Sequence, residues 1–167
     1  KYYLLAIEKG DNNSLNNLAY MYYEINDIKN KEKAIELAQK ALETNDDIFD
    51  KESLLIIEIW NGIFNDVENR AVEIIKGEND KVTKELLFDL LVQQQKNLIL
   101  RLFQHTEFGA QLQEKYMVLY YVTLLLTSPQ DETLRLRIPP ELQSTIDEVL
   151  EKIKEQQLFY ITPKEIQ

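Results

Sequence analysis

The feature that most constrains the fold of this chain is an internal repeat near its N-terminus. The segment from Tyr2 to Asp11 recurs 35 residues later, between Leu37 and Asp46. The matching pairs are Ala6 with Ala41, Ile7 with Leu42, Glu8 with Glu43, and Asp11 with Asp46. A period of this length is typical of helix-turn-helix units, which bury their apolar faces only by stacking on one another. The repeat therefore predicts a solenoid of helical hairpins.

Apolar residues in the first quarter of the chain follow the period of an α-helix. One stripe with spacing i, i+3, i+4 and i+7 predicts a helix from about Asn13 to Ile25. It consists of Leu15, Leu18, Ala19 and Tyr22. A second stripe consists of Ala34, Leu37, Ala38 and Ala41, and its small alanines would let a neighbouring helix approach closely. The polar residues between the stripes, at 26–30, are the short connector of an antiparallel hairpin.

Later helices are predicted from caps and breaks, because only four glycines and four prolines interrupt the chain. Asp50 is a candidate N-cap for a helix running to about Phe64, and Asp80 for a helix rich in leucine. That second helix carries Leu86, Leu87, Leu90 and Leu91, and Leu98, Leu102 and Phe103 continue the apolar pattern. All-helical structure is therefore expected through the middle of the chain.

The last third is predicted to hold two further helices. After Gly109, a long apolar helix is expected from about Ala110 to Thr127, ended by Ser128 and Pro129. The alternating segment Leu134–Ile138 indicates an extended connector. Pro140 suits the first turn of the final helix, whose apolar side consists of Ile146, Val149, Leu150 and Ile153.

The repeat also resembles a known family. Residues 1–10, KYYLLAIEKG, and residues 16–23, NNLAYMYY, resemble Sel1-like and tetratricopeptide (TPR) repeats. In that family the first helix of a unit carries a large-small pair followed by Tyr, matched here by Leu18, Ala19 and Tyr22. The second helix carries spaced alanines, matched by the stripe that begins at Ala34. From Asp50 onward the motif is lost.

The resemblance implies an all-α solenoid of helix-turn-helix repeats with a divergent C-terminal cap. Residues 1–49 would be the repeats, the first of them truncated, and residues 50–167 degenerate repeats and capping helices, packed as one continuous domain. Because the sequence opens inside a helical pattern, we expect the array to continue N-terminally in the parent protein. Weak self-association through the apolar residues Tyr2, Tyr3 and Ile7 of the first helix is then expected.

The family's usual ligand surface is the concave face formed by the first helices of the units. Here that face would consist of Asn13, Asn16, Asn17, Tyr20, Tyr23 and Glu24. Asparagine amides can hold an extended peptide backbone, and tyrosines provide large contact area at low entropic cost. The alternative is that these side chains are solvated or packed against the following unit. No Lys or Arg stands on this face, so a clamp for terminal carboxylates is disfavoured.

Composition narrows the function classes. A net charge of −10 repels phosphate backbones and anionic lipids, so neither nucleic acid nor a membrane is an expected partner. The longest apolar run, Met117–Leu126, is too short to span a bilayer and predicts a core helix. With no cysteine, thiolate metal sites and cysteine nucleophiles are excluded. We expect a cytoplasmic protein that binds no cofactor.

Few residues point to catalysis or metal binding. His105 is the sole histidine and is expected to be structural or solvent-facing, and Trp60 is expected in the core. Two pairs of glutamates, Glu52 with Glu58 and Glu68 with Glu73, are interpreted as solvated charges. The acidic group Asp46, Asp47 and Asp50 lacks the glycine and final glutamate of a calcium loop, so it predicts caps and loops. We therefore predict no catalytic or metal site.

These observations favour a non-enzymatic scaffold that binds a protein or peptide. Two alternatives stay open. The chain could be a structural cap of a solenoid whose binding surface lies in preceding repeats, or a regulatory appendage of an enzyme within the same parent protein.

Overall fold

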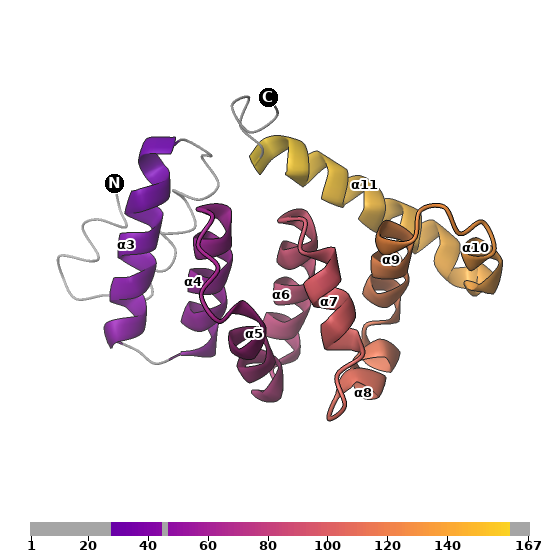
Figure 1. Ribbon diagram of the computed structural model, residues 1–167, viewed down its shortest axis with the longest axis horizontal. Coiled ribbons are helices and arrows are strands. Elements are labelled where there is room, and N and C mark those ends of the chain that lie inside the picture. The colour runs from indigo at the N-terminus through magenta and orange to yellow at the C-terminus, as the bar shows by residue number, and fades with distance from the viewer. Residues whose placement is uncertain (1–27, 45–46, 161–167) are drawn as a thin grey trace. The chain divides into compact units, whose positions relative to one another are not determined.

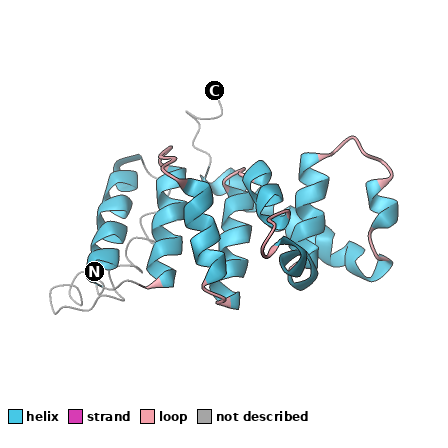
Figure 2. Ribbon diagram, turned by 60° about the horizontal axis from the view of Figure 1, so that its bottom comes forward, coloured by secondary structure: helices cyan, strands magenta, loops and turns pink. Residues whose placement is uncertain are grey.

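The computed structural model describes residues 28–44 and 47–160, and this part of the chain is helical without a strand (Figure 2). The prediction of an all-α fold is confirmed for these residues. The finer prediction, a solenoid of TPR or Sel1-like repeats, stays a prediction.

The helices follow one another with short connections (Figure 1). They are α3 (Ile28–Thr44), α4 (Ile48–Trp60), α5 (Val67–Lys76), α6 (Asp80–Val92), α7 (Lys96–Phe103), α8 (Gly109–Lys115), α9 (Met117–Thr127), α10 (Leu134–Arg137), the 3-10 turn η1 (Pro140–Leu142) and α11 (Gln143–Tyr160). The chain divides into two compact units. Of the described residues, those up to Leu86, together with Phe159 and Tyr160, belong to the first unit, and Leu87–Leu158 form the second.

In the first unit α4 packs against both α3 and α5. The predicted stripe of small residues lies on the buried side of α3, where Ala34, Ala38 and Ala41 are fully buried. Every residue of α4 from Glu52 to Trp60 is buried as well, so this helix is enclosed on nearly all sides. Alanine methyl groups on α3 leave room for the larger leucine and isoleucine side chains of α4.

The ends of α4 and the start of α6 differ from the sequence-based expectation. Asp47, not Asp50, is the N-cap of α4, and its carboxylate accepts the Phe49 N–H at 3.0 Å. The helix stops at Trp60 rather than near Phe64, because Gly62 adopts a left-handed φ of 77° that reverses the chain. For α6 the cap is Asn79, whose side chain accepts the Val82 N–H at 3.1 Å, one residue before the predicted Asp80.

In the second unit α7 packs against α8 and α9, with Leu98, Ile99, Leu102 and Phe103 buried between them. The long helix predicted from Ala110 to Thr127 is two helices. Tyr116 separates them with φ −116° and ψ 49°, outside the helical region. Gly109 opens α8 against the end of α7, where a Cβ atom would lie 2.6 Å from the carbonyl oxygen of Phe103. Any larger residue would force these two segments apart.

The segment Leu134–Ile138, predicted to be extended, forms the single helical turn α10 followed by an extended Ile138. Asp131 initiates this turn: its carboxylate accepts the Thr133 N–H at 3.1 Å and the Thr133 hydroxyl at 2.6 Å. These bonds form an Asx turn just before α10, which favours a turn over the extended backbone that the alternating residues suggest. Pro140 begins η1, which leads directly into α11, close to its predicted place.

The final helix packs through the predicted apolar side. Ile146 and Ile153 are buried, and Val149 and Leu150 are partly buried. One turn further on, Gln157 Nε2 donates to the Leu91 carbonyl oxygen of α6 at 3.3 Å. Residues Gln143–Leu158 of α11 belong to the second unit.

The close approach of α3 and α4 generates a stability prediction. Replacing Ala38 with Leu adds three carbon atoms at a fully buried position, so overpacking should lower the free energy of unfolding by about 1–3 kcal/mol. Gln39→Leu, at an exposed position of the same helix, is the matched control and should change it by less than about 0.5 kcal/mol. Urea denaturation followed by circular dichroism measures both. Equal effects at the two positions would contradict the packing of this stripe against α4.

Candidate functional site

The concave face predicted from the sequence lies outside the described residues. This holds for all six of its members, Asn13, Asn16, Asn17, Tyr20, Tyr23 and Glu24, and for the predicted contact residues Tyr2, Tyr3 and Ile7. The face therefore stays a prediction, and candidate sites are sought in residues 28–44 and 47–160.

The histidine contributes to loop structure. His105 Nδ1 accepts the backbone N–H of Glu107 at 3.2 Å, and its ring stacks on Phe108 with centroids 4.1 Å apart and planes within 3°. These contacts shape the loop between α7 and α8, which confirms the structural interpretation. Across the described ranges, no three His, Cys, Asp or Glu side chains are grouped so that they could hold a metal ion.

The prediction that Glu52 and Glu58 are solvated is wrong, because both are buried in α4. The helix is enclosed on nearly all sides, so positions that would face water on an amphipathic helix are covered as well. Glu58 accepts from Arg70 Nη1, which joins α4 to α5. The two glutamates are six positions apart, which corresponds to about 9 Å of rise along the helix axis.

The second predicted pair is exposed. Glu68 and Glu73 both lie on the solvent side of α5, and Glu73 forms an ion pair of 2.8 Å with Lys51 of α4. Trp60, at the end of α4, is buried as predicted. The ion pairs Lys51–Glu73 and Glu58–Arg70 both join α4 to α5.

Asp50 is an acid of the first unit whose pKa is shifted. It lies in the first turn of α4 with only 7 % of its surface exposed. Burial raises the pKa of its carboxyl from 3.8 to about 6, and the nearby negative charge of Asp47 adds to this effect. The cap role predicted for the acidic group belongs to Asp47, while Asp46 lies outside the described residues.

The apolar run that forms α9 is only partly a core helix. Leu119, Val122 and Thr123 are buried on its inner side. The opposite side carries four residues with the helical spacing i, i+4, i+7 and i+8, namely Met117, Tyr121, Leu124 and Leu125. Met117 is 38 % exposed, and the other three are partly exposed. We call these four residues the outer α9 stripe. No charged residue occurs in α9, so an apolar face meets solvent here.

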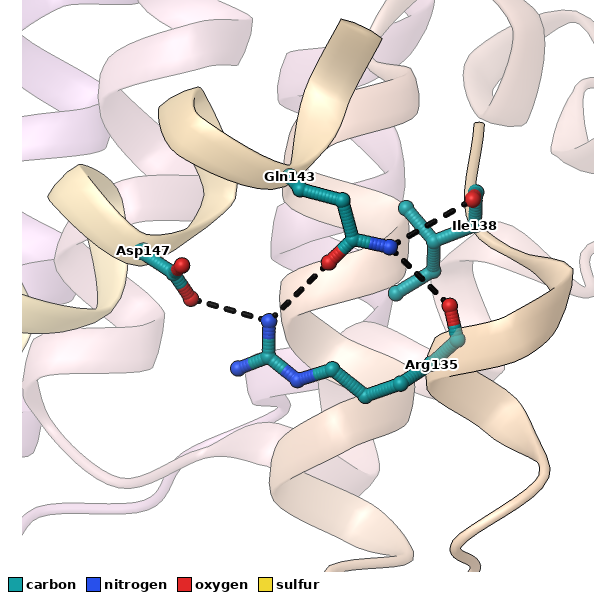
Figure 3. Close-up of polar contacts among 4 residues, drawn as sticks. All are labelled: Arg135, Ile138, Gln143 and Asp147. Atoms are coloured by element: carbon teal, nitrogen blue, oxygen red, sulfur yellow. Dashed lines mark hydrogen bonds and ion pairs between the residues drawn. The ribbon is translucent and has the colours of Figure 1, made fainter. Parts of the chain in front are cut away.

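A second surface feature is the junction of α10 with α11 (Figure 3). Arg135 Nη1 donates to Gln143 Oε1 at 3.2 Å and to Asp147 Oδ1 at 2.9 Å. In return, Gln143 Nε2 donates to the carbonyl oxygens of Arg135 at 2.9 Å and Ile138 at 3.4 Å. These reciprocal bonds fix the backbone of α10 relative to the start of α11. We call this set the α10 clamp.

The clamp presents two arginines with a leucine between them. Leu136 is 85 % exposed, and Arg137 Nη2 pairs with Asp131 Oδ2 at 3.2 Å. The hydrogen bond from the Thr133 hydroxyl, together with Arg137, holds the pKa of Asp131 below its ordinary value. Helical periodicity does not predict this turn, because Arg135 reaches Gln143 and Asp147 across η1, which is a tertiary contact.

No protein-family model, no curated protein and no solved structure matches this chain. The resemblance to Sel1-like and TPR repeats therefore rests on the residues quoted from the sequence. Within the described part of the chain, no helix combines the length and apolar content needed to cross a membrane.

The raised pKa of Asp50 predicts the pH dependence of stability. The folded state binds this proton more tightly than the unfolded state, so the charged carboxylate opposes folding above about pH 6. Asp50→Asn should therefore raise the free energy of unfolding at about pH 8, by up to about 3 kcal/mol, and the gain should vanish near pH 4.

Urea denaturation at several pH values measures this difference. Glu85→Gln, at an exposed position of α6, controls for the loss of one negative charge. A constant difference between Asp50→Asn and the native chain across this pH range would contradict the assignment.

The α10 clamp generates a separate prediction. Gln143→Ala removes the donor that satisfies two carbonyl oxygens, and the free energy of unfolding should fall by about 1 kcal/mol. Amide hydrogen exchange at Ile138, which donates to the Arg135 carbonyl oxygen, should accelerate. Gln156→Ala, at an exposed site on α11, is the control and should change neither quantity. Unchanged exchange at Ile138 in the Gln143 variant would show that the clamp does not fix the turn.

Proposed function

We propose that this chain is a protein-interaction module, the scaffold function favoured by its sequence. The observation that carries the proposal is the outer α9 stripe. A helix that is apolar all round is normally enclosed within a protein. In α9, Leu119, Val122 and Thr123 are enclosed, while Met117, with 38 % exposure, and the rest of the stripe stay accessible.

The composition of the stripe suits a protein partner. Interfaces are enriched in Met and aromatic residues and depleted of charge at their centres. Tyr121 offers a broad apolar ring with a polar hydroxyl, and Met117 adapts its shape to irregular surfaces. An opposing protein surface that covered these side chains would remove apolar area from water, which is the main favourable term in association.

A capping role is the second candidate, and α11 supports it. Its inner side, with Ile146 and Ile153, is buried, whereas its other side is polar and exposed. The exposed residues include Glu148, Glu151, Lys152 and Lys154. Terminal elements of helical arrays need such a polar outer face to stay soluble. The two roles are compatible, because a capped array can bind a partner through another helix.

A comparative pull-down tests the interaction role. Met117→Glu with Leu124→Glu places two charges in the outer α9 stripe, so partner recovery should fall at least about ten-fold. Thr145→Glu with Gln156→Glu adds the same charge at exposed positions of α11 and should leave recovery unchanged. A third variant, with Asn13, Asn16, Tyr20 and Tyr23 replaced by Ala, tests the predicted concave face in the same experiment.

Circular dichroism must first show that each variant is folded. A partner lost only with the α9 variant supports the proposal. If the partner is lost only with the third variant, the result assigns binding to the predicted concave face. Equal partner recovery with all folded variants contradicts binding at either surface and favours the capping role.

A further inference from the structure

The turn that the α10 clamp holds differs in chemistry from the outer α9 stripe. Arg135 is 44 % exposed and Arg137 65 % exposed, and Leu136 projects between them into solvent. A single exposed leucine is ordinary on a protein surface. What distinguishes this one is its position between two guanidinium groups whose orientations are fixed by other residues of the chain.

The bonds of Arg135 use one nitrogen of its guanidinium. Both Gln143 Oε1 and Asp147 Oδ1 accept from Nη1. Figure 3 shows that the opposite edge, formed by Nε and Nη2, is directed away from both partners. This edge presents two parallel N–H groups, the arrangement that binds a carboxylate through two hydrogen bonds.

We propose that the α10 turn binds a segment of a partner protein that carries one carboxylate beside an apolar side chain. The carboxylate accepts from Nε and Nη2 of Arg135, and the apolar side chain covers Leu136. This inference rests on the proposed interaction function and names the chemistry of one contact.

Acidic residues around the turn repel negative charge, so the bound partner segment can carry few negative groups. Asp147 and Asp131 already offset the two arginines, and Glu132 and Glu141 are exposed close by in the sequence. The whole chain carries a net charge of −10. A polyacidic tract or a phosphorylated segment would be repelled by these groups, whereas a single carboxylate gains two charge-assisted hydrogen bonds.

The turn is prepared for binding before a partner arrives. Gln143 satisfies the carbonyl oxygens of Arg135 and Ile138, and Asp131 accepts the Thr133 N–H and hydroxyl at its start. Because these bonds already restrict the backbone and the Arg135 side chain, less conformational entropy is lost on association.

An NMR titration of the full chain tests this proposal. The probes are the peptide N-acetyl-Leu-Glu-Leu-amide, the same peptide with Gln in place of Glu, and inorganic phosphate. The Arg135 Nε–H resonance should shift with the Glu peptide, with a dissociation constant of the order of 1 mM, and should move at most slightly with the other two.

Two variants and a control locate the contact. Arg135→Lys keeps the charge but loses the paired N–H groups, so Glu-peptide binding should weaken at least about five-fold. Leu136→Ser should weaken it by about three-fold or more through lost apolar contact. Arg101→Lys, at an exposed position of α7, should leave binding unchanged.

Absence of an Arg135 shift with the Glu peptide, or equal shifts with the Gln peptide or with phosphate, would overturn the proposal. The proposed function and this contact can fail separately. If a partner depends on the outer α9 stripe but the Glu peptide does not shift the Arg135 resonance, the interaction role stands and only this contact is refuted.

Discussion

The enclosure of α4 is the constraint on which the first unit depends. Small side chains on α3 allow close approach on one side, and α5 covers another. This packing explains why α4 buries nine consecutive residues, and why its polar groups depart from ordinary behaviour. Glu58 has an ion-pair partner on α5, whereas burial makes Asp50 a weaker acid than usual. Apolar packing around α4 thus removes these two carboxyl groups from water.

Local sequence signals predicted the helices well and their ends less well. The helical spacing of Ala34, Ala38 and Ala41 predicts that they share one face of a helix, and these residues are buried. The cap of α4 was misplaced because Asp47 and Asp50 are both suitable N-cap residues, and only the backbone geometry at Asp47 selects between them. The break at Tyr116 falls inside an uninterrupted apolar pattern and carries no glycine or proline that would mark it.

Surface chemistry was harder to predict than the core. The alternation in Leu134–Ile138 indicated an extended segment, yet Asp131 and Thr133 initiate a helical turn. Gln143 and Asp147 then meet Arg135 because η1 turns the chain back toward α10, which is a tertiary contact. Likewise, the composition of Met117–Leu126 predicted a core helix but could not tell which of its side chains stay partly accessible to solvent. The residues of the predicted concave face lie outside the described part of the chain, so that prediction has no outcome.

Gly109 also limits how this protein can evolve. Its Cα lies so close to the end of α7 that a methyl group would meet the Phe103 carbonyl oxygen and adjacent backbone, which cannot move aside as a flexible side chain can. Drift at this codon would be tolerated only together with a compensating change in the loop that contains His105 and Phe108. In a set of related sequences, this position should therefore vary less than the exposed Ala110 that follows it.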